Sequence, residues 1–134
     1  MKARFLILIL ILNPFISKAQ TLKIKWLDGV GREFGIVAPT GDLSYSMLPG
    51  DKIEYERYGD FVGQIRQIGN VRIEYERYGD LKGKVIKVGD VRIEYENYGA
   101  NKGRLRKVGG LTIEYEEYGA LAGKIRKTTG QVHY

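Results

Sequence analysis

The chain has 134 residues, no cysteine and a formal net charge of +6. Its size fits one domain, and the lack of cysteine excludes disulfides, a thiolate nucleophile and a cysteine metal site. The first 19 residues hold three of the 22 basic residues and no acidic residue, so the rest of the chain carries only +3. So small a net charge does not favour a nucleic-acid partner.

Residues 1–19 have the features of a secretory signal peptide. The segment begins with basic residues, continues with an unbroken apolar run at 5–12, and ends with small residues at Ser17 and Ala19, the two positions that a signal peptidase reads. The apolar run is shorter than the roughly 20 residues needed to cross a bilayer. We therefore predict cleavage between Ala19 and Gln20, a secreted or periplasmic protein, and no transmembrane segment in the mature chain.

A repeat of 20 residues organises the chain from residue 51 onward. The four units are DKIEYERYGDFVGQIRQIGN, VRIEYERYGDLKGKVIKVGD, VRIEYENYGANKGRLRKVGG and LTIEYEEYGALAGKIRKTTG. One isoleucine, two tyrosines and two glycines recur at the same positions in every unit, whereas the residues before the repeat do not match it. We predict a signal peptide at 1–19, an irregular β segment that caps the fold at 20–50, four hairpin repeats at 51–130 and a tail at 131–134.

Each unit is expected to form a β-hairpin. Its first strand, VRIEYERY at 71–78, alternates β-branched or aromatic residues with charged ones, and its second, GKVIKV at 83–88, is shorter and more basic. Gly-Asn at 69–70 is typical of a two-residue turn between units, and Gly79 suits the connection within the unit because glycine tolerates a positive φ. The predicted fold class is all-β, an antiparallel β-meander of about nine or ten strands that forms a curved open sheet.

Two strand registers are compatible with a unit. Pairing Tyr78 with Leu81 would place Glu74 beside an apolar valine, whereas pairing Tyr75 with Val85 sets glutamates opposite basic side chains, which stabilises a sheet. The second register is favoured, although it requires a bulge or an odd-length loop, and it places Glu74 opposite Ile86. In the later units it predicts the pairs Glu94–Arg106, Glu96–Arg104, Glu114–Arg126 and Glu116–Lys124.

The favoured register gives the sheet one apolar face of isoleucine, tyrosine and valine, which must be covered. The sheet could curl on itself toward a barrel, or it could dock against the N-terminal segment that contains Trp26. It could also pair with another molecule, or remain a single layer held by tyrosines and lysine stems. The sequence leaves these alternatives open.

The order of residues around the second tyrosine resembles a known repeat. Tyr78-Gly79-Asp80-Leu81-Lys82-Gly83-Lys84-Val85 is similar to the YD repeat of the Rhs family, in which Tyr-Asp, two variable residues and Gly-Arg-Leu follow a tyrosine-rich strand. The third unit ends in Gly103-Arg104-Leu105 but has Ala100 in place of the aspartate. The resemblance covers residues 51–130 and implies stacked hairpins without catalytic residues. The unit also resembles exported bacterial repeat proteins that have no established function.

Catalytic and metal chemistry find little support in the sequence. The one histidine, His133, lies beside the C-terminus, and no motif surrounds the two serines that follow the leader, so no catalytic triad can be assembled. The glutamate pairs recur identically in every unit and lack the asymmetry that a pair of catalytic carboxyls needs. We interpret them as an ion-pair ladder and predict no catalytic residue, no cofactor and no metal site.

A binding or structural role remains, with the tyrosines and the basic strands as candidates. The first tyrosine column is expected to pack, and the second, beside the turn, is the better candidate for exposure and for stacking on a ligand. The candidate binding residues are Tyr58, Tyr78, Tyr98, Tyr118, Lys84, Arg104, Arg106, Lys124 and Arg126. The expected partner is another protein or a second copy of the chain, with an envelope glycan or another polyanion as the alternative.

Overall fold

The computed structural model describes residues 20–133, so the predicted signal peptide lies outside the described residues. The described chain contains eleven strands in two antiparallel sheets, which confirms the all-β meander. The first sheet has the order β1-β2-β3, with β1 at Leu22–Leu27, β2 at Glu33–Ala38 and β3 at Asp42–Tyr45. Among the described residues, none of the helices has the length and apolar character needed to cross a membrane.

The second sheet is a meander of eight strands, in which each strand pairs with its neighbour in the sequence. Its strands are β4 (Ile53–Tyr55), β5 (Ile65–Ile68), β6 (Val71–Tyr75), β7 (Val85–Val88), β8 (Val91–Tyr95), β9 (Leu105–Val108), β10 (Leu111–Tyr115) and β11 (Ile125–Thr129). Each unit thus supplies one hairpin, and short 3-10 turns at Gly59–Phe61 and Gly119–Leu121 lie in the first and last loops. The sheet stays open, with β4 and β11 at its two edges.

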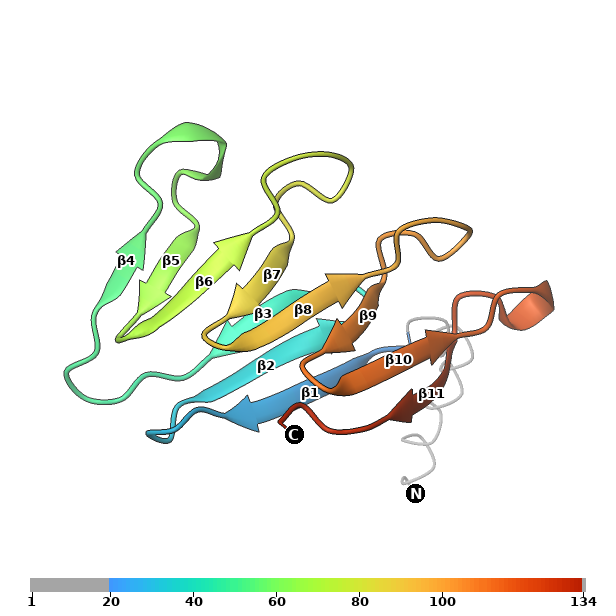
Figure 1. Ribbon diagram of the computed structural model, residues 1–134, viewed down its shortest axis with the longest axis horizontal. Coiled ribbons are helices and arrows are strands. Elements are labelled where there is room, and N and C mark those ends of the chain that lie inside the picture. The colour runs from blue at the N-terminus through green and yellow to red at the C-terminus, as the bar shows by residue number, and fades with distance from the viewer. Residues whose placement is uncertain (1–19, 134) are drawn as a thin grey trace, which may run out of the picture.

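The three-stranded sheet covers one face of the hairpin sheet (Figure 1). Trp26 and Phe34 stack with ring centroids 5.9 Å apart and are 7% and 1% exposed, within a core that also contains the apolar residues of the hairpins. Hydrogen bonds also join the layers, among them one from the Leu105 N–H to the Pro39 carbonyl (2.9 Å) and one from Lys84 Nζ to the Thr40 carbonyl (3.2 Å). Of the alternatives that the sequence left open, docking of the N-terminal segment is the one observed. Residues 20–50 therefore contain a regular sheet.

A β-bulge recurs at the same place in all four hairpins. Tyr75 pairs with Val85, as predicted, but the register then shifts, so that Glu74 lies opposite Lys87 and Ile73 opposite Val88. The prediction that Glu74 faces Ile86 is therefore wrong, because Ile86 is the extra residue of the bulge. The bulge explains why Val85 and Val88, three residues apart, are both buried, which strict alternation of faces would forbid.

Ion pairs connect the two strands of three hairpins across the bulge. Arg66, Arg106 and Arg126 pair with Glu54, Glu94 and Glu114 respectively. The ion pairs expected for Glu94 and Glu114 therefore form. The predicted register at these two glutamates is nevertheless wrong, because the bulge sets them opposite Lys107 and Lys127. Glu96 instead meets Arg104 through the backbone, with its N–H donating to the Arg104 carbonyl at 2.9 Å. All three ion pairs are partly solvated, so each contributes little to stability.

A buried arginine joins the two sheets at the opposite end from the tyrosine loops. The Arg32 side chain donates to both carboxylate oxygens of Asp51, at 2.7 and 2.8 Å, to Asp28 at 2.8 Å and to Asn70 at 3.0 Å. Asp51 also accepts from the Leu48 N–H. One side chain thus connects the first turn of the three-stranded sheet, the crossover to the hairpins and the first turn between hairpins.

This cluster makes stability depend on pH in the acid range. Hydrogen bonds from the Arg32 side chain, with one from a backbone N–H, lower the pKa of Asp51 to about 2, below its unfolded value of about 3.9. The stabilisation is therefore present above pH about 4 and is lost as the pH falls toward about 2. Thermal unfolding followed across this range should show a shallower acid decline for Asp51→Asn than for wild type. Identical declines would contradict the assignment.

Candidate binding surface

The first tyrosine column is part of the fold. Tyr75, Tyr95 and Tyr115 are 8%, 3% and 5% exposed. Each hydroxyl donates to a carbonyl in the preceding hairpin, that of Ile65, Val85 and Leu105 respectively, at 2.5 to 2.7 Å. Because these bonds recur with the same offset of ten residues, they connect consecutive hairpins. The expectation that the first column packs is confirmed for these three tyrosines.

Burial of these phenols predicts loss of stability at alkaline pH. Desolvation raises the pKa of Tyr95 and of Tyr115, the latter to about 12, above the unfolded value of about 10. A raised folded pKa means that the contribution is complete below pH about 10 and is lost as the pH rises toward about 12. Tyr115→Phe, which removes the ionisable group, should weaken the pH dependence of unfolding in this range. An unchanged dependence would argue against burial of this phenol.

The second tyrosine column is exposed. The side chains of Tyr58, Tyr78, Tyr98 and Tyr118 are 82–85% exposed, the highest values among the large hydrophobic and aromatic residues of the described chain. They lie in the loops that connect the two strands of each hairpin, and these loops form a row at one end of the sheet (Figure 1). The expectation that this column is the more exposed one is therefore confirmed.

The four loops share one conformation. In each, the glutamate before the loop donates its N–H to the carbonyl eight residues further on, just before the next strand, as between Glu76 and Lys84 at 2.8 Å. The carbonyl of the same glutamate accepts from the glycine seven residues further on, as from the Gly83 N–H at 2.8 Å. The same two bonds recur at 56, 96 and 116 within 0.1 Å. The glycine after each tyrosine has a positive φ, 81° at Gly79, which L-residues adopt only at a cost. The tyrosines are thus held in equivalent positions.

The neighbouring loop positions vary while the tyrosine does not. Where the first unit has Asp60, Phe61 and Val62, the third has Ala100, Asn101 and Lys102. The invariant glycines are explained by their backbone conformation, but an aromatic ring that is more than 80% exposed adds little to the core. The fold therefore does not account for a tyrosine at this position in all four hairpins.

The structure divides the five basic candidates into two groups. Lys84 and Arg104 lie over the rings of the packed tyrosines Tyr95 and Tyr115, at 5.4 and 5.8 Å from the ring centroids, and Lys124 occupies the equivalent position in the last hairpin. Arg106 and Arg126 belong to the other group, because they pair with the glutamates of the neighbouring strand. No single basic stripe therefore unites the five residues.

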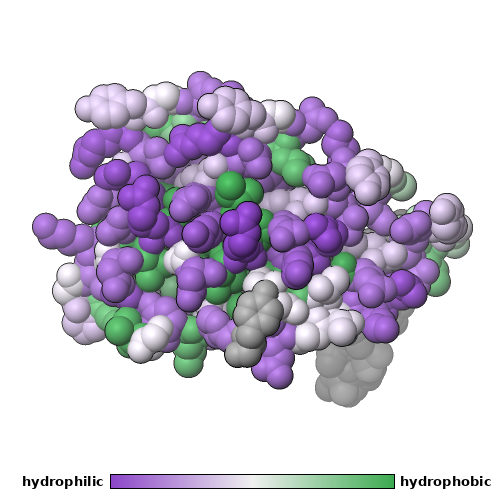
Figure 2. All heavy atoms as spheres, in the orientation of Figure 1, coloured by the Kyte–Doolittle hydropathy of each residue, from purple (hydrophilic) through white to green (hydrophobic). Residues whose placement is uncertain are grey.

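One groove brings four of the candidate residues together. A groove of about 520 Å³ between the third and fourth hairpins is lined by Tyr98, Tyr118, Arg106 and Arg126, with Glu96, Glu114 and Glu117 also in its wall. Its tyrosines are exposed and its arginines already carry carboxylate partners. The groove thus combines aromatic surface with charges of both signs. Hydrophilic residues dominate the face of the molecule seen in Figure 2.

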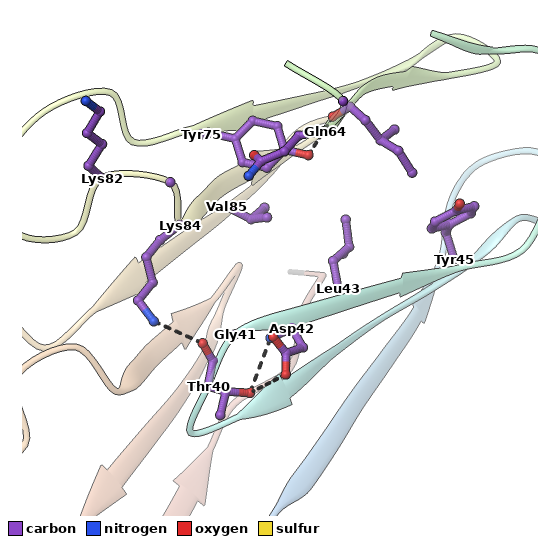
Figure 3. A pocket seen from close by; sticks show the side chains of 13 residues that line it. Thr40, Gly41, Asp42, Leu43, Tyr45, Gln64, Tyr75, Lys82, Lys84 and Val85 are labelled. Atoms are coloured by element: carbon purple, nitrogen blue, oxygen red, sulfur yellow. Dashed lines mark hydrogen bonds between the residues drawn. The ribbon is translucent and has the colours of Figure 1, made fainter. Parts of the chain in front are cut away.

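A second cleft, of about 630 Å³, lies between the layers at the free edge of β3. Leu43 and Tyr45 project from β3 toward Tyr75 and Val85 of the hairpin sheet, and Lys84 closes one side through its bond to Thr40 (Figure 3). Sequence reasoning missed this cleft, because it depends on how the three-stranded sheet docks. Of the candidate residues, Lys84 alone borders it.

Within residues 20–133, no group of three or more histidine, aspartate or glutamate side chains is placed to hold a metal ion. His133 lies with its Nε2 3.1 Å from the Leu27 carbonyl, apart from the tyrosine loops. When the chain is compared with protein-family models, with curated proteins and with solved structures, none of them matches. The resemblance to the YD repeat therefore stays a prediction.

Proposed function

We propose that the protein is a non-enzymatic, exported interaction module of the cell envelope that binds another protein through its row of loop tyrosines. The observation that carries this proposal is the exposure of Tyr58, Tyr78, Tyr98 and Tyr118, each above 80%, in loops of one conformation. Export rests on the signal-peptide features of residues 1–19. The absence of a family match leaves the site itself as the basis for the proposal.

Tyrosine suits a protein partner for physical reasons. Its ring offers a large and rigid contact area at a small cost in conformational entropy, and its hydroxyl adds a hydrogen bond. Aromatic residues are accordingly enriched in protein interfaces. Consecutive hairpins are two strand spacings apart, so the four rings recur at about 10 Å. Such a row presents an extended surface in which several moderate contacts act together.

The groove between the third and fourth hairpins favours a second candidate, an acidic envelope glycan. Sugar rings stack on exposed aromatic faces, and Tyr98 and Tyr118 both line this groove. Arg106 and Arg126 could contact carboxylate or phosphate groups of such a chain. Their existing pairs with Glu94 and Glu114 weaken this attraction, which is why a protein partner comes first.

The test is capture from envelope fractions of the source cell on the immobilised protein, with washes at low and high salt. Wild type is compared with the variant in which Tyr58, Tyr78, Tyr98 and Tyr118 are all changed to serine, and bound material is identified by mass spectrometry and sugar analysis. We expect one protein to be retained at high salt by wild type and lost by the variant.

The matched control is Leu27→Ser, which removes a side chain of comparable character, 58% exposed, from the other sheet. This control should capture as wild type does. Polysaccharide that elutes at high salt and depends on the tyrosines would instead support the glycan candidate. Capture that the tyrosine variant retains in full would refute both.

A further inference from the structure

The contacts between consecutive hairpins follow one pattern, repeated three times. A tyrosine of the first strand donates its hydroxyl to a carbonyl at the start of the second strand in the preceding hairpin, as Tyr75 does to Ile65. The loop of the preceding hairpin packs beside it. At the first junction the Phe61 ring lies 5.9 Å from that of Tyr75, and the Arg77 guanidinium lies 4.9 Å from the Phe61 centroid.

The loop residue at the position of Phe61 is covered in every hairpin that has a successor. Phe61 is 6% exposed, Leu81 packs against the core and Asn101 is 9% exposed. In the last hairpin the equivalent residue, Leu121, is 54% exposed. Its loop has the same backbone hydrogen bonds as the others, so the difference arises because, within the described residues, no further hairpin packs beside it.

The first hairpin shows the other half of the same contact. Tyr55 occupies the position of the buried tyrosines Tyr75, Tyr95 and Tyr115, yet it is 45% exposed. Within the described part of the chain its hydroxyl has no hydrogen-bond partner, because no hairpin precedes it. Terminal units of repeat proteins normally carry polar substitutions that end the stack. Here the first unit keeps the tyrosine and the last keeps the leucine.

We infer that a second copy of this chain docks head to tail, with β4 of one copy beside β11 of the next. The Tyr55 hydroxyl then donates to the Ile125 carbonyl of the neighbouring copy, which is the equivalent of the Tyr75–Ile65 bond, and the Tyr55 ring covers Leu121. The internal junctions supply the template for this contact. Because the two surfaces are different, the contact is heterologous and builds an open row of copies.

Charge along this junction reproduces one of the two ion pairs found at the first internal junction. Inside the chain, Arg77 pairs with Glu56 of the preceding hairpin at 3.3 Å, and the equivalent residues across two copies are Arg57 and Glu116. The internal Lys82–Asp60 ion pair is replaced there by Val62 and Ala120, which carry no charge. Lys52 would face Lys127, a like-charge contact of the kind that Lys87 and Arg92 already make within the sheet.

Sedimentation velocity over a range of concentrations tests this inference with three variants. Tyr55→Ser disables one end and Leu121→Glu disables the other. The control is Tyr78→Ser, an exposed residue in the loop of the second hairpin, which lies at neither end of the row. Wild type and the control should show a mass that rises with concentration. Each end variant should associate at least about tenfold more weakly, as loss of a central contact residue commonly does.

Mixing the two end variants gives the decisive result. Each variant keeps the end that the other has lost, so the mixture should form a dimer and nothing larger. Both altered positions are exposed, so the melting temperatures should stay close to wild type. Wild type that remains monomeric at its highest soluble concentration, end variants that associate as wild type does, or a mixture that remains monomeric would each overturn the inference.

The head-to-tail contact uses residues separate from the loop tyrosines, so the two proposals fail independently. The variant with all four loop tyrosines changed to serine should still self-associate. Loss of self-association in that variant alone would place the contact in the loops and overturn the head-to-tail arrangement.

Discussion

Phe34→Ala is expected to lower the free energy of unfolding by about 3–5 kcal/mol, the usual cost of removing a buried aromatic ring. Phe34 is 1% exposed, stacks on Trp26 and lies in the layer that covers the hairpins. Its removal opens a cavity between the two sheets. The hydrogen-bonded strands on either side are rigid and cannot easily move together to close it. Urea denaturation, with the midpoint and slope fitted together, measures the change.

The control for this prediction is Leu27→Ala in the neighbouring strand. Leu27 is 58% exposed, so its truncation should change stability by no more than about 0.5 kcal/mol. A Phe34→Ala protein as stable as this control would mean that the N-terminal sheet does not supply the cover for the hairpins.

Truncating the two tyrosines of one hairpin should change the free energy of unfolding by very different amounts. Tyr95→Ala removes a side chain that is 3% exposed and leaves the Val85 carbonyl without its phenol donor, at a cost of about 3 kcal/mol or more. Tyr98→Ala, three residues away, removes a ring that is 83% exposed and should cost no more than about 0.5 kcal/mol.

Paired thermal or urea unfolding of these two variants compares the columns directly. Tyr95→Phe keeps the ring and loses only the hydroxyl. Its loss of unfolding free energy should lie between those of the other two variants, at about 1 kcal/mol. Equal destabilisation by Tyr95→Ala and Tyr98→Ala would mean that both columns hold the fold together, and the loop tyrosines would then need no function.

Much of the hairpin sheet could be predicted because its signals are local. The Gly69-Asn70 turn sets Ile68 opposite Val71, and alternation along 71–75 buries Val71, Ile73 and Tyr75 on one face. The choice of register followed from cross-strand charge, and it is correct at the Tyr75–Val85 pair, although the bulge shifts the residues before that pair. These features depend on residues within one unit or its neighbour, which a repeated sequence displays four times.

The bulge was only partly foreseen. The favoured register required either a bulge or an odd-length loop, but alternation alone does not say which of the two occurs or which residue is extra. The burial of both Val85 and Val88 identifies Ile86, and that information comes from the packed core. Val85 and Ile86 are both apolar, so the sequence does not indicate which of the two faces the core.

Contacts distant in the sequence could not be predicted. Arg32 reaches Asp51 and Asn70, 19 and 38 residues away, and nothing in its local sequence distinguishes it from the many other arginines of the chain. The same holds for docking of the three-stranded sheet and for the cleft at β3, which exist because the two layers meet. Exposure of the second tyrosine column, in contrast, was predicted from its place beside a turn.

The central claim is that the loop tyrosines act as one extended binding surface, and stepwise removal tests it most directly. Tyr58, Tyr78, Tyr98 and Tyr118 are changed to serine one, two, three and four at a time, and the affinity for the captured envelope partner is measured for each protein. Our account predicts that affinity falls with every tyrosine lost, by up to about tenfold per ring, while the melting temperature stays near that of wild type. An affinity that is unchanged when all four are gone would contradict it.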